Sequence, residues 1–190
     1  MTRKIFFELF SYFIHEALYS EGEELSDKAK RFLDDMGDDA DELVELLRQS
    51  PLETLHDTSK KFGHEVFLRY RKNRLEKVVL GTFDSGTSEV LKAKEVNEVF
   101  DLVVAITRLN INTGNGRLLV KGEDKTIAFG FSNHYKQMAI KAKKVFSEDL
   151  NYNNGLESDK YKYLKISVSP VRLRSGKTIK YLIKGFHNDE

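Results

Sequence analysis

Apolar residues recur at three- and four-residue steps in the first 60 residues, the spacing that lines one side of a helix. The strongest stripe runs over residues 5–18, and others follow over 26–36, over 39–47 and from 51 onward. Ser26 suits a helix cap, and Ser50 followed by Pro51 suits the start of another helix. The pattern predicts a compact helical region over residues 1–62.

From residue 63 onward apolar and polar residues alternate, as they do along strands. Runs over 66–71 and 78–83 predict a hairpin, and the segment 84–88 is expected to form a loop. Three further runs, at about 99–110, 117–121 and 126–131, are separated by glycine-bearing turns. They predict a three-stranded meander.

After the meander, Ser132 and Asn133 supply a cap for an amphipathic helix over about 133–147. Two strands follow around 164–168 and 179–183. At Pro170 the positions expected to face inward change from even to odd residues, as they would at a bulge or an edge. Strand, strand, strand, helix, strand, strand is the order of the OB-fold. The expected fold class is therefore α+β: a helical region over 1–62, then an antiparallel, OB-like small β-barrel over 63–190.

Composition narrows the class of protein. The 190-residue chain is 40% apolar and 32% charged, and no apolar run approaches the roughly 18 residues that a membrane span needs. The apolar segment 5–18 is interrupted by charged residues and lacks a small-residue cleavage site, so no signal peptide is expected. The absence of cysteine excludes disulfides and thiol catalysis. We expect a soluble, cytoplasmic protein that does not enter membranes.

Charge is divided unevenly along the chain. Residues 1–62 carry 8 Lys and Arg against 15 Asp and Glu, a balance of −7, whereas residues 63–190 carry 23 against 15, a balance of +8. Three interpretations follow: the basic part faces a polyanion, the acidic part docks on a basic partner protein, or the two parts of this chain attract each other.

No motif with a known chemistry is present. Gly114-Asn115-Gly116 lacks the third glycine of a dinucleotide fingerprint and the Gly-Lys-Ser/Thr ending of a P-loop, so it predicts a turn. The five histidines have no metal-ligand spacing. His15-Glu16 and the set around Asp84 and Glu89 lack the spacing of known nucleases. The sequence therefore predicts no catalytic residue, cofactor or metal, and favours a non-enzymatic protein.

Basic residues interleaved with aromatic ones are the strongest candidate for a function. Lysine and arginine neutralise phosphates and exposed rings stack on bases, which together would make a single-strand groove. Ordinary outward strand positions would carry the same residue types, so solubility is the alternative explanation. The expected nucleic-acid contacts are Arg117, Lys162, Tyr163, Lys165, Arg172, Arg174, Lys177 and Lys180.

A second candidate lies before the predicted turn. Asn110, Asn112 and Thr113 supply more hydrogen-bonding groups than a hairpin needs. They would either cap the backbone where the strand bends or point outward beside Arg117 and form a ligand loop.

The segment AITRLNINTGNGRLL, followed by KTIAFGF, is similar to a motif of an uncharacterised bacterial family in which a short barrel carries Asn-x-Asn-Thr, a glycine and Gly-Arg before its second strand. The similarity covers roughly residues 99–131, and the matching positions are Asn110, Asn112, Thr113, Gly116 and Arg117. The rhythm of the segment also resembles cold-shock and related OB-like barrels. The resemblance implies a small barrel and brings no activity with it.

Two functions are therefore expected. The first is a non-enzymatic protein whose basic barrel binds nucleic acid, with single-stranded DNA or RNA favoured. The alternative is an interaction subunit of a larger bacterial or phage assembly, for instance in defence or counter-defence, which docks on a protein partner through residues 1–62.

Overall fold

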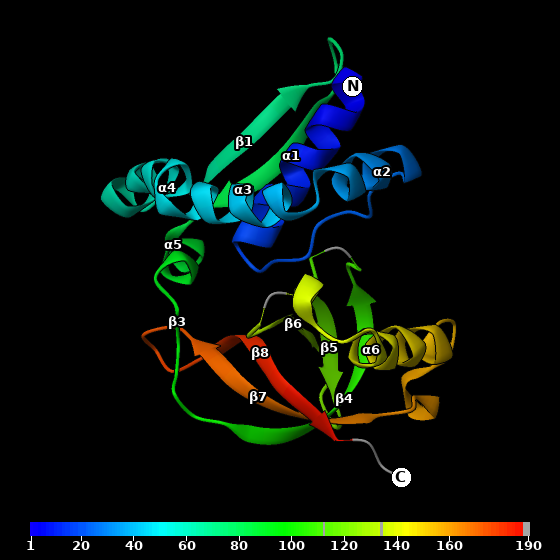
Figure 1. Ribbon diagram of the computed structural model, residues 1–190. Coiled ribbons are helices and arrows are strands. Elements are labelled where there is room, and N and C mark those ends of the chain that lie inside the picture. Colours follow the sequence, from blue (N-terminus) through cyan, green and yellow to red (C-terminus); the bar gives the residue numbers. More distant parts are fainter. Residues whose placement is uncertain (112, 134, 188–190) are drawn as a thin grey trace. The chain divides into compact units, whose positions relative to one another are not determined.

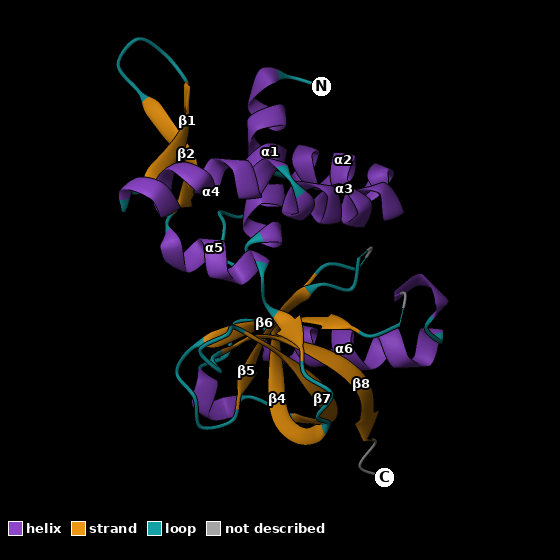
Figure 2. Ribbon diagram, turned by 90° about the vertical axis from the view of Figure 1, so that its left-hand side faces the viewer, coloured by secondary structure: helices purple, strands orange, loops and turns teal. Residues whose placement is uncertain are grey.

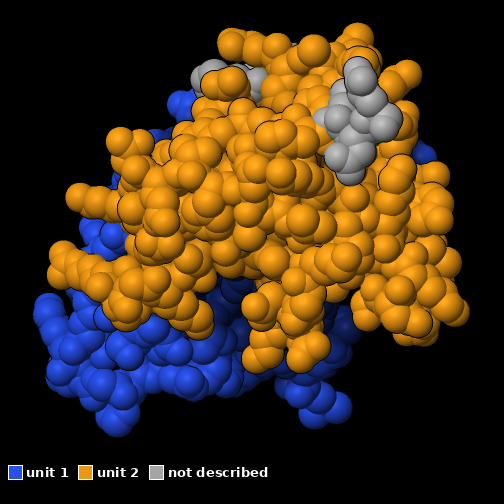
Figure 3. Space-filling view, turned by 90° about the horizontal axis from the view of Figure 1, so that it is seen from below, with its two compact units in different colours: residues 1–93 blue, residues 94–190 orange. Residues whose placement is uncertain are grey.

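The computed structural model describes residues 1–111, 113–133 and 135–187. Contacts divide the chain into two compact units, Met1–Ala93 and Lys94–Glu190 (Figure 3). The division falls after Ala93, whereas the sequence led us to expect it after residue 62. No helix of the described residues has the length and apolarity that crossing a membrane requires.

The first unit begins with four helices, in the places where the sequence predicts them (Figure 1). The Thr2 and Ser26 side chains accept hydrogen bonds from the first turns of the first two helices, and Pro51 opens the fourth. Gly63 ends the fourth helix with a φ of 68°, a left-handed conformation that favours glycine. The helices are α1 (Arg3–Ala17), α2 (Asp27–Met36), α3 (Asp38–Gln49) and α4 (Pro51–Phe62).

The predicted hairpin belongs to this first unit. Strands β1 (Val66–Arg71) and β2 (Lys77–Phe83) are antiparallel, and Leu80 and Phe83 are buried in one cluster with Ile14 and Leu52. A Cβ at Gly81 would lie 2.7 Å from Ile14 Cγ2, so glycine permits the close approach of strand and helix. The hairpin therefore completes the helical core, which is why the division between units lies beyond it.

The segment expected as a loop after β2 is a short helix, α5 (Ser85–Leu91). Asp84 Oδ1 accepts a hydrogen bond from the Thr87 N–H, and Thr87 Oγ1 accepts one from the Asp84 N–H, which makes a capping box. The polar residues read as a loop are thus the start of a helix.

The second unit is a closed five-stranded β-barrel (Figures 1 and 2). Strand β4 pairs with β5 and β7, β5 with β6, and β7 with β8, all antiparallel. The β6–β8 pair that closes the barrel is parallel, so the expectation of a wholly antiparallel barrel was wrong at this pair. The strands are β4 (Phe100–Leu109), β5 (Gly116–Val120), β6 (Thr126–Phe131), β7 (Leu164–Arg172) and β8 (Thr178–His187), and β3 (Lys94–Glu95) adds to β7.

The helix between the third and fourth barrel strands starts later than expected. The Ser132 N–H donates to the Ile183 carbonyl, so this residue continues the barrel and does not cap a helix. A short 3-10 turn, η1 (Tyr135–Gln137), precedes helix α6 (Ile140–Asn153), and another, η2 (Ser158–Lys160), follows it. Phe146 of α6 is fully buried in the barrel core.

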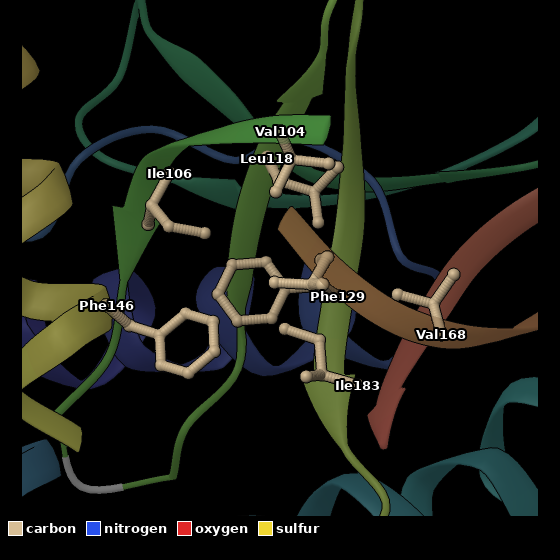
Figure 4. Packing of buried hydrophobic residues seen from close by; sticks show 8 residues of the cluster. Val104, Ile106, Leu118, Phe129, Phe146, Val168 and Ile183 are labelled. Atoms are coloured by element: carbon tan, nitrogen blue, oxygen red, sulfur yellow. The ribbon is translucent and has the colours of Figure 1, made fainter. Parts of the chain in front are cut away.

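Side chains from all five strands and α6 fill the barrel (Figure 4). The register brings Ile106 opposite Leu118 and Val168 opposite Ile183, so alternate residues of neighbouring strands point inward together. The buried cluster consists of Val104, Ile106, Leu118, Phe129, Phe146, Ile166, Val168 and Ile183.

Bulges interrupt the barrel at the places where strands must bend. The β4–β5 register shifts between Ile106 and Arg108, and the β7–β8 register shifts between Ser167 and Val168 and again after Val171. The β7 bulges flank Pro170, near which the sequence predicts a change of phase. At the β4 bulge the Ile106 N–H donates to Asp149 Oδ2 of α6 at 2.7 Å.

Candidate nucleic-acid interface

The register places three basic residues in one line across the outside of the barrel, and two of them, Arg117 and Lys180, are predicted contacts. Arg108 on β4 is opposite Arg117 on β5, Arg117 is opposite Ala128 on β6, and Ala128 is opposite Lys180 on β8. The next residues along these strands include the buried Leu118 and Phe129, so the line lies on the other, outer face. We call Arg108, Arg117 and Lys180 the basic row.

Small side chains form the floor between Arg117 and Lys180. Two strand spacings separate their backbones by about 10 Å, and the side chain between them is the methyl group of Ala128. A Cβ at Gly130 would lie 2.9 Å from Asn115 Oδ1 and 3.1 Å from Lys180 Cε. Glycine therefore leaves the space in which these two side chains meet.

Both predicted members of the row are held in place by polar neighbours. The Arg117 guanidinium donates to Thr126, from Nε to the hydroxyl and from Nη2 to the carbonyl, each at 2.9 Å. Lys180 Nζ donates to Asn115 Oδ1 at 3.2 Å. A long cation fixed in this way loses less side-chain entropy on binding an anion.

Side chains of the predicted ligand loop make hydrogen bonds to backbone groups of the same loop. Asn110 Oδ1 accepts from the Thr113 N–H and Thr113 Oγ1 accepts from the Asn115 N–H, both at 3.3 Å. The Asn110 backbone pairs with Asn115 and Gly114 at 2.8 Å. Asn112 lies outside the described residues. These hydrogen bonds are of the capping kind that the sequence left open for Asn110 and Thr113, and the ligand loop stays a prediction.

Asn115, which the sequence did not single out as a site residue, reaches the basic row through its contact with Lys180. The loop is fixed from its other side by Tyr135, because a Cβ at Gly114 would lie 2.5 Å from the Tyr135 ring. Gly114 has a φ of 74°, which also favours glycine. Burial raises the pKa of the Tyr135 hydroxyl, and Lys143 Nζ lies 4.9 Å from the centre of the ring.

Three more predicted contacts lie at the β7–β8 turn, which leads into Lys180. Arg174 and Lys177 are exposed in the turn, whose backbone is closed by Leu173 N–H donating to the Lys177 carbonyl at 2.9 Å. Arg172 is partly neutralised, since its Nη1 lies 2.9 Å from Glu98 Oε2. The turn therefore presents two exposed cations beside one end of the row.

The remaining predicted contacts lie at the other end of β7. Lys162 and Tyr163 precede the strand, and Lys165 is opposite Val103. Lys165 Nζ pairs with Asp101 Oδ2 at 3.1 Å, and the Tyr163 hydroxyl donates to the Ser158 carbonyl at 3.4 Å. These three residues are separated from the β7–β8 turn by nearly the whole length of the strand. The structure thus divides the predicted set into two groups.

An acidic site accompanies the second group. Hydrogen bonds from the Ser167 hydroxyl first, then from Lys165 and His187, lower the pKa of Asp101 to about 2. The carboxylate is therefore ionised at neutral pH and offsets the charge of Lys165. Ser167 and His187 Nε2 both contact the same oxygen, Asp101 Oδ1, at 2.7 and 3.2 Å. His187 Nε2 also lies 3.0 Å from Ser167 Oγ. Because the same ring nitrogen contacts both the serine and the aspartate, whereas a catalytic triad uses one nitrogen for each, this cluster does not have the geometry of a triad.

Among residues 1–111, 113–133 and 135–187 no group of three or more His, Cys, Asp or Glu side chains is arranged to hold a metal ion. Comparison of the chain with protein-family models, with curated proteins and with solved structures found no match.

Proposed function

We propose that the barrel unit binds single-stranded DNA or RNA across the basic row, with the β4–β5 loop and the β7–β8 turn on either side. The observation that carries this proposal is the cross-strand register, which aligns Arg108, Arg117 and Lys180 on one outer face above a floor of Ala128 and Gly130. A line of cations over small residues offers a path for a phosphate backbone.

An OB-like barrel is part of the same proposal. Its support is the closed order β7-β4-β5-β6-β8, the helix between the third and fourth barrel strands, and the parallel contact of the third and fifth. Barrels of that type bind oligonucleotides over their second and third strands and the loops at either side. In this chain those elements are β5, β6, the β4–β5 loop and the β7–β8 turn.

Binding to the basic row should be dominated by phosphate contacts. The row consists of arginine and lysine side chains. Tyr163, the aromatic residue that the sequence predicts as a contact, lies at the far end of β7. Each phosphate contact contributes about −0.7 to the slope of log affinity against log salt for a single strand. Affinity should therefore fall steeply with salt and depend little on base sequence.

Fluorescence anisotropy of a labelled single-stranded oligonucleotide with the full chain, over a salt series, tests the proposal. Lys180→Ala should weaken binding for every sequence tested and reduce the magnitude of the salt slope by about 0.7. Lys28→Ala is the matched control, because Lys28 is an exposed lysine on α2 of the other unit. Absence of wild-type binding at low salt, or equal binding by the two variants, would overturn the proposal.

A second function is favoured by apolar side chains exposed on helices α2 and α3. Phe32 of α2 is 37% exposed and Leu46 of α3 is 52% exposed. Helix α3 carries five Asp and Glu against one Arg, whereas α2 carries three residues of each charge. We propose that these helices dock on a basic protein partner, as a subunit of a bacterial or phage assembly would. Affinity capture with the full chain should recover a partner that Phe32→Asp fails to recover. A wild-type chain that captures nothing, and is monomeric by light scattering, would contradict this function.

A further inference from the structure

The hairpin of the first unit has an outer face that its own core does not use. We call residues 66–83 the ribbon. Along β1 the partly buried residues alternate with the exposed Phe67, Arg69 and Arg71. Across the pair, Arg69 is opposite Val79 and Arg71 is opposite Lys77, and both of these β2 residues are exposed. One face of the ribbon thus carries three cations among apolar side chains.

The tip of the ribbon is ordered by its own hydrogen bonds. Asn73 Oδ1 accepts from the N–H groups of Leu75 and Glu76, each at 2.9 Å, and the Lys72 N–H donates to the Glu76 carbonyl at 3.0 Å. The Glu76 carboxylate is bound by Lys72 Nζ at 2.8 Å and by Asn73 Nδ2 at 3.2 Å. On this tip the Leu75 side chain is 99% exposed.

The strands of the ribbon are fixed to helix α1, in β1 directly before the tip and in β2 at its middle. The Phe7 and Tyr70 rings stack with centroids 3.9 Å apart, and the Ser11 hydroxyl donates to the Leu80 carbonyl at 2.9 Å. Arg3 Nη2 donates to the Arg71 carbonyl at 3.2 Å. An isolated two-stranded hairpin is marginally stable, so this anchoring is what allows the ribbon to present a fixed face.

Charge indicates what the ribbon would contact. Residues 66–83 carry five Lys and Arg and one Glu, although residues 1–93 as a whole carry 14 basic against 19 acidic residues. The single carboxylate is already bound to Lys72 and Asn73. The acidic excess of the unit lies in α3 and in residues 18–26. A polyanion would be attracted to the ribbon and repelled by those two segments, so the approach is confined to one part of the unit.

We propose that the ribbon is a separate site for duplex nucleic acid. A two-stranded β-ribbon fits a duplex groove, where Arg69, Arg71 and Lys77 would contact phosphates. Leu75 is the apolar side chain that would be inserted against a base step, as apolar wedges are in proteins that bend DNA. This inference uses residues of the first unit alone, so it does not depend on single-strand binding by the barrel.

The first experiment measures anisotropy of a labelled duplex of about 20 base pairs, long enough for two helical turns, with the full chain over a salt series. Arg71→Glu combined with Lys77→Glu should reduce affinity at least tenfold at low salt, because two phosphate contacts worth about −0.9 each in salt slope become repulsive. The control is Lys28→Glu combined with Arg31→Glu, two exposed cations of α2. No duplex binding by the wild type, or equal losses in both double variants, would overturn the proposal.

The second experiment separates the wedge from the phosphate contacts. Energy transfer between dyes at the duplex ends should show bending by the wild type, and Leu75→Ala should abolish most of it while affinity falls only a few-fold. Leu156→Ala, an exposed leucine that follows α6, should leave bending unchanged. An unbent duplex would overturn the role of Leu75. Loss of single-strand but not duplex binding in Lys180→Ala would show that the barrel and ribbon sites act separately.

Discussion

His56 in the first unit and Asp149 in the second are both buried ionisable side chains, and they differ in how their polar atoms are paired. His56 on α4 is fully buried, and both ring nitrogens have partners: Nδ1 lies 2.6 Å from the Leu52 carbonyl and Nε2 lies 2.8 Å from Thr87 Oγ1. Asp149 on α6 is 3% exposed, and its Oδ2 accepts from Ile106 and from Asn153. Its Oδ1 has no partner.

The partners of His56 suit the neutral ring. A carbonyl only accepts, so Nδ1 carries the proton that is donated to Leu52. In the neutral ring Nε2 accepts from the Thr87 hydroxyl, which also lies 3.2 Å from the Asp84 carbonyl. Burial lowers the pKa of His56, and the neutral ring satisfies both contacts. The site therefore holds an uncharged group at neutral pH and loses nothing by burying it.

Asp149 is instead buried with hydrogen bonds from the described residues to only one of its two carboxylate oxygens. Burial raises its pKa to about 6, against the lowering effects of the Ile106 N–H, the nearby Lys162 and Asn153. The carboxylate is nevertheless useful, because it holds the Ile106 N–H at the bulge that precedes Arg108 of the basic row. His56 is neutral when it is deprotonated, and Asp149 is neutral when it is protonated. Burial of these two side chains therefore makes stability depend on pH in opposite directions.

The largest effect on stability is expected from removing His56, whose two ring nitrogens both have partners. His56→Ala should lower the free energy of unfolding by about 3–5 kcal/mol, because it leaves a cavity and removes the hydrogen bond between the ring and Thr87. Urea unfolding at pH 8 measures the loss. His64→Ala, at an exposed position just after α4, should change stability by less than about 0.5 kcal/mol. Similar losses in the two variants would contradict the role assigned to His56.

The pH dependence of the two sites should have opposite signs. Between its unfolded pKa of 3.8 and about 6, Asp149 binds more protons in the folded state, so its contribution to stability is present at low pH and is lost as pH rises through about 6. The total change is roughly 3 kcal/mol, from about two pKa units. His56 has a lowered pKa, so its contribution is present above about 6.5 and is lost as pH falls through the folded pKa.

Thermal unfolding between pH 5 and 8 distinguishes these contributions. Asp149→Asn keeps an oxygen for Ile106 and removes the charge, so its stability relative to wild type should rise with pH across this range. Glu148→Gln, the exposed neighbour on α6, should follow the wild-type profile. If the stability of Asp149→Asn changed with pH in the same way as that of the wild type, ionisation of the carboxylate would carry no cost in folding free energy.

The regular elements could be predicted because their signals are local. The alternation that buries Val104, Ile106 and Leu118 is visible in the sequence, and so are the caps of the first helices. The short helix α5 was missed because Asp84, Ser85 and Gly86 are typical of loops, although Asp84 and Thr87 have the spacing of a capping box.

The candidate site could be predicted only in part, because its geometry depends on distant pairings. Arg117 and Lys180 were named from their residue type, but they are aligned by the β6 strand between them. Asn115 reaches Lys180 across 65 positions of sequence, and no local pattern indicates that contact. Asp149 looks like one more polar residue of an amphipathic helix until the β4 bulge brings the Ile106 N–H to it.

The smallest effect should come from the partner of His56. Thr87→Val removes the hydroxyl that donates to Nε2 and accepts from the Asp84 N–H, so unfolding should become easier by about 1–2 kcal/mol. Thr87→Ser keeps the hydroxyl and is the matched control. If hydrogen bonds at both ring nitrogens are what distinguishes His56 from Asp149, the stability of Thr87→Val should also fall less in acid than that of the wild type. The neutral ring has lost one of its two hydrogen bonds in this variant, so protonation of the ring removes less stability. An unchanged acid response in Thr87→Val would assign the pKa shift to burial alone.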